Sequence, residues 1–133
     1  MSERRLGRSV WAVAAGILVN AVPALMIDQF FHVIEVYPPW GVPMNDTGDN
    51  LLALSYRIVL AVAGGWATAA LAPRNPGRHV AVLAVIGLIL GTLGAVATIP
   101  LQLGPAWYPI LIALTGPPAT LVGGRLARAR TGG

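Results

Sequence analysis

Four apolar runs, each about as long as a membrane is thick, dominate the sequence. They cover residues 9–27, 51–72, 79–99 and 106–124. A helix needs roughly 20 predominantly apolar residues to cross the hydrocarbon core of a bilayer, so each run can span a membrane. Only 11% of the 133 residues are charged, against about 25% in a soluble domain. We therefore expect an all-α membrane protein with one domain, residues 1–133, whose four transmembrane helices form an up-down bundle.

The first run follows an arginine-rich segment and could be read as the apolar region of a signal peptide. It is longer than the usual region of about 7 to 15 residues, and no small-x-small cleavage pattern closes it. We interpret it as a retained spanning helix. The helix can continue past residue 27, as far as residue 36.

The arginines predict the orientation of the bundle. Eight of the nine lie before the first run, between the second and third, or after the fourth, and the opposite connections carry acidic residues but no basic one. Cytoplasmic segments of membrane proteins collect basic residues, so we expect both termini in the cytoplasm. The use of arginine alone, with abundant alanine, glycine and proline, is typical of a high-GC bacterium. This predicts a multi-pass protein of the bacterial inner membrane.

The composition excludes several function classes. Without cysteine, the chain cannot supply a thiolate nucleophile, exchange disulfides or hold a thiolate-bound cluster. Its net charge of +4 does not indicate nucleic-acid binding, because the arginines follow membrane topology rather than one face. His32 and His79 fall at opposite ends of their helices, so one chain cannot provide both axial ligands of a haem. We expect no cofactor. An enzyme is not our leading hypothesis, and a metal-dependent enzyme that uses Asp28, His32 and Glu35 is a third alternative.

A polar stretch directly after the first run contains the most informative side chains. If the helix continues, Asp28, His32 and Glu35 are spaced i, i+4, i+7 and share one face. Two carboxylates and an imidazole could hold a divalent metal or relay protons. The alternative is an amphipathic helix end whose polar face meets water at the outer interface.

Arg57 is the one charge inside the second run, about two turns from its outer end. Near the middle of a membrane an unpaired charge costs at least ~2.5 kcal/mol, so we expect an ion pair with Asp28 or Glu35. The pair could tie two helices together. It could also help to line a small polar pocket that opens outward and takes an anionic or polar ligand. The candidate ligand-binding residues are Asp28, His32, Glu35, Tyr56 and Arg57.

The segment 37–43 is rich in proline and cannot be helical throughout. We expect it to lie across the outer mouth of the bundle. Trp40 then either inserts among lipid headgroups or forms a platform for a ligand or partner. In the polar loop that follows, Asp49 or Asn50 is expected to cap the second helix.

Small residues at four-residue spacing mark helix contact faces in membranes. One such ridge is predicted on the third helix and one on the second, and Gly-Gly pairs occur on the second and fourth. These faces could pack within one chain, between two copies, or against another membrane protein. The ridges comprise Gly87, Gly91 and Ala95 on the third helix, and Ala61, Gly65 and Ala69 on the second.

The order of these motifs resembles a group of small uncharacterised bacterial four-helix membrane proteins. The features that carry the resemblance are D-x3-H-x2-E followed by YPPWG, then SYR, GGWATAALAPR, RHVAV, WYP and GGRL. The resemblance implies the topology and no activity. Our leading hypothesis is a structural, accessory or interaction protein of the bacterial inner membrane, with the lipid bilayer and another membrane protein or a second copy as partners. The alternative is a small transporter or ligand-binding membrane protein with an outward-facing polar pocket.

Overall fold

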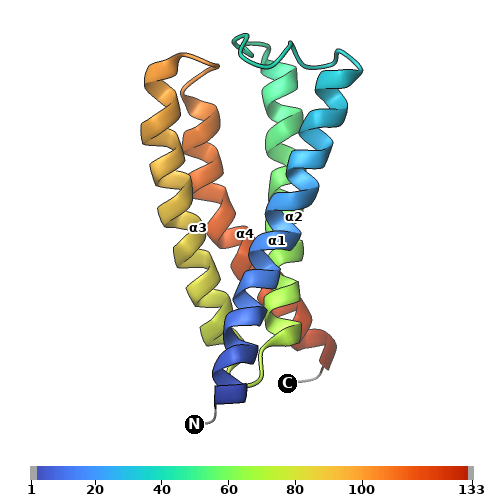
Figure 1. Cartoon of the computed structure of the whole chain (residues 1–133), viewed down its shortest axis with the longest axis vertical. Helices are drawn as coiled ribbons and strands as arrows, with labels where there is room; N and C mark the ends of the chain where they lie inside the picture. The colour runs from blue at the N-terminus through green and yellow to red at the C-terminus, as the bar shows by residue number, and fades with distance from the viewer. Residues whose placement is uncertain (1–2, 132–133) are drawn as a thin grey trace.

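The computed structural model describes residues 3–131, and the side chains of residues 5–129, as helices joined by short connections. Each of the four long helices is long and apolar enough to cross a membrane. Successive helices alternate in direction, and the first helix begins at the end of the bundle where the fourth finishes (Figure 1). The prediction of an all-helical membrane fold with four spans is confirmed. The elements are α1 (Glu3–Val33), α2 (Thr47–Leu71), α3 (Pro76–Thr98), the 3-10 turn η1 (Ile99–Leu101) and α4 (Trp107–Thr131).

The first two helices differ from the predicted bounds at the connection between them. The first helix continues past residue 27 as expected, but it ends at Val33 and not at residue 36, and Glu35 adopts a left-handed backbone conformation with a φ of 65°. α2 begins four residues earlier than expected. Its N-cap is Asp46, whose carboxylate accepts a hydrogen bond from the backbone N–H of Asp49 at 2.9 Å. The prediction of Asp49 or Asn50 as the cap is therefore wrong.

The other two helices are longer than their apolar runs. α3 begins at Pro76, where proline's fixed φ and missing N–H suit the first turn of a helix. α4 contains Pro117 and Pro118 and continues to Thr131. Alanine and arginine are strong helix formers, so the helix continues after the apolar run has ended.

Glycines bring the helices into backbone contact in the half of the bundle nearest the termini. A Cβ added at Gly65 of α2 would lie 2.0 Å from the carbonyl oxygen of Thr120 in α4. One added at Gly123 of α4 would lie 1.9 Å from the carbonyl oxygen of Val62. The two helices therefore touch through their main chains, and the predicted ridge on the second helix packs within the chain.

The ridge on the third helix is only partly used. A Cβ at Gly91 would lie 3.0 Å from the Cα of Ala113 in α4, and Ala95 is buried. At Gly87 an added Cβ would meet nothing within 4 Å. The same is true at Gly94. α3 thus contacts α4 closely at some turns and leaves open space beside others.

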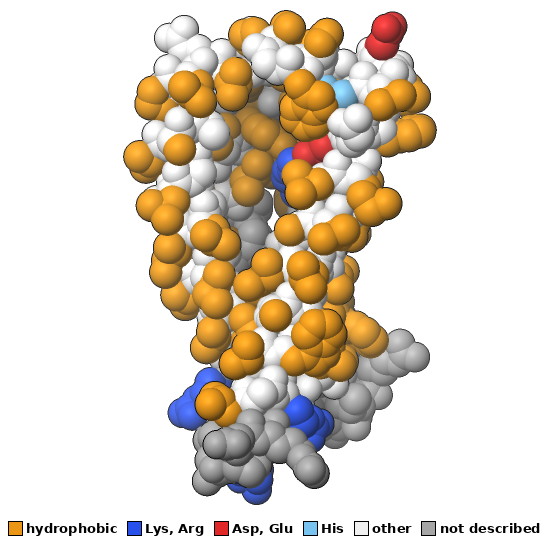
Figure 2. All heavy atoms as spheres, in the orientation of Figure 1, with side chains coloured by type: hydrophobic (Ala, Val, Ile, Leu, Met, Phe, Trp, Pro, Cys, Tyr) orange, Lys and Arg blue, Asp and Glu red, His pale blue; other side chains and the backbone are white. Residues whose placement is uncertain are grey.

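The bundle opens at the end opposite the termini, which we call the loop end because it holds residues 34–46 and η1. From the glycine crossing towards the loop end, the hairpin of α1 and α2 diverges from the hairpin of α3 and α4 (Figure 1). The space-filling view shows a hollow between them, with acidic and basic side chains inside it (Figure 2). Buried hydrophobic side chains are mostly alanines, whereas many leucines, valines and isoleucines point outward. This distribution suits a small bundle surrounded by lipid.

Candidate functional site

An ion pair between the first two helices forms the centre of the candidate site. Asp28 of α1 is buried, with 7% of its surface exposed. Its carboxylate accepts hydrogen bonds from the Tyr56 hydroxyl and from Nη2 of Arg57, both on α2. Of the two partners predicted for Arg57, the structure selects Asp28. Paired and hydrogen-bonded, these charges escape the penalty of isolated charges in an apolar layer.

Tyr37 extends the hydrogen-bonded network into the loop. Its hydroxyl lies 3.0 Å from that of Tyr56, and because Tyr56 donates to Asp28, Tyr37 is the donor of this bond. Tyr37 is 3% exposed, and its ring lies 5.3 Å from that of Phe31. Burial raises the pKa of the Tyr37 phenol above its usual value. The phenol therefore keeps its proton at neutral pH and remains a donor.

His32 holds the loop instead of joining the carboxylates. Its ring stacks on Trp40 with 3.7 Å between centroids, and its Nδ1 donates to the carbonyl oxygen of Pro38 at 2.6 Å. The indole N–H of Trp40 donates in turn to Oε1 of Gln29 at 2.8 Å. The proline-rich segment therefore packs onto the end of α1 through the His32–Trp40 stack.

Glu35 does not belong to the site. The stripe that was predicted to contain Asp28, His32 and Glu35 required a continuous helix, but α1 ends at Val33 and Glu35 is exposed in the turn that follows. Among the residues that the structure describes, no three His, Asp or Glu side chains are grouped to hold a metal ion. The structure gives no support to the metal-binding hypothesis for these three residues.

A cavity of about 190 Å³ lies beneath the loop, and we call it the polar cavity after the few charged and hydrogen-bonding side chains in its mostly apolar wall. The Asp28–Arg57 pair, His32 and Trp40 line it together with Tyr108 of α4. Arg57 also lines a second, larger opening of about 370 Å³, which we call the interhairpin cleft and to which all four helices contribute. Arg57 Nη1 is buried and has no hydrogen-bond partner among the described residues. A buried charged donor without a partner costs free energy, so this nitrogen is the least satisfied group of the site.

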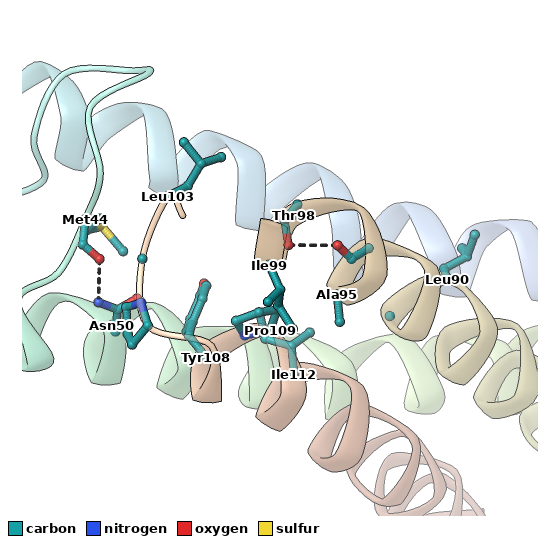
Figure 3. Close-up of a pocket in the computed structure, with 14 residues that line it drawn as sticks. Met44, Asn50, Leu90, Ala95, Thr98, Ile99, Leu103, Tyr108, Pro109 and Ile112 are labelled. Carbon is teal, nitrogen blue, oxygen red and sulfur yellow. Dashed lines mark hydrogen bonds between the residues drawn. The ribbon is translucent and has the colours of Figure 1, made fainter. Parts of the chain in front are cut away.

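A third cavity, of about 390 Å³, lies between α3, α4 and the loop (Figure 3). Apolar side chains make up most of its wall, and Arg57 is not among them. Asn50, which is 1% exposed, donates through Nδ2 to the carbonyl oxygens of Met44 at 3.0 Å and Asp46 at 2.8 Å. These two bonds fix the end of the loop against the start of α2.

Sequence reasoning assigned no site role to Tyr37 or Tyr108. Both are aromatic residues near the expected membrane surface, where tyrosine and tryptophan are common for reasons of solvation alone. Tyr37 carried one signal, since its neighbouring prolines predicted a segment that lies across the bundle mouth. Nothing in the sequence indicated that Tyr108, on the fourth helix, would face the pair formed by the first two.

Compared with known proteins, the chain matches no family model, no curated protein and no solved structure. Any function must therefore be argued from the site itself. The cavity wall offers one arginine with spare donor capacity, its neutralising carboxylate, two tyrosines and a stacked His–Trp pair. A third tyrosine, Tyr56, donates to the carboxylate.

Proposed function

We propose that this chain is a small ligand-binding protein of the bacterial inner membrane, and that Arg57 contacts a ligand through an oxygen atom. The observation that carries the proposal is the buried Nη1 of Arg57, which has no partner among the described residues although the side chain lines two cavities. The other terminal nitrogen, Nη2, is already engaged by Asp28. A small rotation of the guanidinium that brings Nη1 to the wall of either cavity would let an incoming acceptor complete its hydrogen bonding, and the bond from Nη2 to Asp28 would be kept.

A purely structural role for the pair explains less of this geometry. If Asp28 and Arg57 only joined α1 to α2, the bond through Nη2 would be sufficient, and the second nitrogen would be left as an uncompensated cost. Binding sites commonly combine a mostly apolar cavity with a few convergent polar groups. Arg57 and Tyr108 come from different hairpins and line the same polar cavity, which supports a binding role.

The ligand class follows from the donor. Guanidinium groups match carboxylate and phosphate oxygens in charge and geometry, so the preferred ligand carries one of these groups. With the arginine-rich ends in the cytoplasm, the cavity opens towards the outer side of the membrane. This orientation is part of the proposal, as is the bacterial inner membrane.

The accessory-protein hypothesis is a second candidate with less structural support. It relied on ridges of small residues as surfaces for a partner, but Gly65 and Gly91 pack against α4 of the same chain. Gly87 and Gly94 remain open. A partner helix would have to use these positions on α3.

The proposal can be tested by native mass spectrometry of the protein extracted from its own membrane in a mild detergent. The test variant is Asp28→Asn with Arg57→Gln, which removes both charges together because removing one alone strands its buried partner. The control is Arg74→Gln, an exposed arginine at the opposite end. We expect the wild type and the control to retain a small molecule with a carboxylate or phosphate, and the double variant to lose it. Identical sets of retained molecules in all three proteins would overturn the proposal.

A further inference from the structure

The interhairpin cleft shares Arg57 with the polar cavity and leads away from it into the membrane. Its lining is mostly apolar, and on α3 it runs from Leu83 to Gly91. Eight residues of helix rise about 12 Å at 1.5 Å per residue, which is the length of an acyl segment. The cleft is therefore elongated, with its charged residue near the loop end and apolar walls towards the membrane centre.

The open side of the cleft lies between α1 and α3. Leu25 of α1 and Leu90 of α3 both line it, and they are 62% and 55% exposed. In a chain that spans the membrane, these exposed leucines contact lipid. On the water side, by contrast, the polar cavity is lined by the loop residues Tyr37, Pro39 and Trp40. The interhairpin cleft can therefore be reached from the bilayer, whereas the polar cavity lies beneath the loop.

From this geometry we infer that the ligand is an amphiphile of the membrane itself, with a phosphate or carboxylate head bound at Arg57 and its apolar chain in the interhairpin cleft. This inference rests on the proposed function, since it uses the same donor. Hydrogen-bond complementarity selects a head with acceptor oxygens, because Nη1 of Arg57 has no partner among the described residues while Nη2 is engaged by Asp28. The direction of the cleft selects a lipid of the outer leaflet, whose head lies near the membrane surface and whose chain points to the centre.

Gly87 and Gly94 provide a matched pair of variants on α3. Gly87 lines the cleft, Gly94 lines the cavity of Figure 3, and a Cβ at either position meets nothing within 4 Å. Gly87→Leu should therefore fill the cleft without disturbing the fold. Gly94→Leu makes the same exchange on the same helix and leaves the cleft open.

The probes are dodecyl phosphate, which has both head and chain, and inorganic phosphate, which has only the head. Occupancy is measured by native mass spectrometry against probe concentration for the wild type, the two glycine variants and the Asp28→Asn, Arg57→Gln double variant. We expect dodecyl phosphate to bind the wild type and Gly94→Leu alike. It should bind Gly87→Leu about tenfold more weakly or worse, because the filled cleft no longer takes the apolar chain. A loss of at least that size is expected in the double variant, because the guanidinium that holds the head is gone.

The outcomes separate this inference from the proposed function. Unchanged binding in Gly87→Leu, with loss only in the double variant, would place a head at Arg57 without a chain in the cleft. Equal affinity of the wild type for inorganic phosphate and dodecyl phosphate would lead to the same conclusion. Either result would overturn the inference of an amphiphilic ligand and leave the proposed binding site at Arg57 supported. Equal binding of dodecyl phosphate to all four proteins would overturn both.

Discussion

The close crossing of α2 and α4 can be tested by adding one methyl group. In Gly65→Ala the new Cβ would lie 2.0 Å from the carbonyl oxygen of Thr120 and 2.8 Å from its carbonyl carbon. Side-chain Cβ atoms essentially never approach other heavy atoms within 3.0 Å, so the helices must separate by about 1 Å. The obstacle is main chain and cannot rotate away. Overpacking of this kind typically costs about 1 to 3 kcal/mol, and we expect the free energy of unfolding of Gly65→Ala to fall by that amount.

The measurement is reversible unfolding of the purified protein in mixed micelles by SDS titration, followed by tryptophan fluorescence. Trp66 lies next to the crossing, since a Cβ on Gly123 would be 2.9 Å from its backbone nitrogen. The control is Gly87→Ala, where the added Cβ meets nothing within 4 Å. It should unfold at the same SDS fraction as the wild type or a higher one, because alanine favours a helix over glycine. If Gly65→Ala and Gly87→Ala unfold together, the helices are not held in backbone contact and the reasoning is refuted.

Two further predictions concern the loop. In Asn50→Ala the carbonyl oxygens of Met44 and Asp46 lose the Nδ2 donor. We expect the free energy of unfolding to fall by about 1 to 3 kcal/mol and amide hydrogen exchange in residues 40–46 to become faster. Unchanged exchange in these residues would contradict this role of Asn50. Burial raises the pKa of Tyr37 above 10.0, so the folded state keeps this proton more tightly than the unfolded state. The contribution of protonated Tyr37 to the free energy of unfolding is then complete below pH 10 and declines as the pH rises above 10. Thermal unfolding between pH 8 and 11 should show a steeper alkaline decline for the wild type than for Tyr37→Phe, and parallel declines would contradict this.

The fold could be predicted because the membrane restricts the choice of structure so strongly. Backbone groups in hydrocarbon must be hydrogen-bonded within the chain, and a run of about 20 apolar residues satisfies this as a helix. The first and last residues of each helix were less predictable, because the ends of these helices extend beyond the apolar layer. There, caps and helix propensity decide where a helix stops, as at Asp46 and in the arginine-rich end of α4.

The ion pair of Arg57 could be predicted, because a charge inside an apolar run needs a partner of opposite charge. A lone arginine in an apolar run requires a carboxylate, and this reasoning led to Asp28 or Glu35, of which Asp28 is the partner in the structure. It failed at Glu35, because the turn after Val33 places a non-glycine residue at positive φ. Such a conformation is uncommon outside glycine and asparagine, so the local sequence gave no warning of it.

The tight crossing and the open cleft follow from one distribution of side-chain size. Gly64, Gly65, Gly123 and Gly124 all lie in the half of the bundle nearest the termini, where an added Cβ would be within 3.0 Å of a neighbouring helix. On the loop side of this crossing, Arg57 and Tyr108 stand on helices that have begun to diverge. There a backbone hydrogen bond from Met44 to the carbonyl oxygen of Leu103, 2.6 Å long, links the two hairpins. A head group that contacts both Arg57 and Tyr108 would add a second link, so the ligand would complete the packing that glycine provides at the other end.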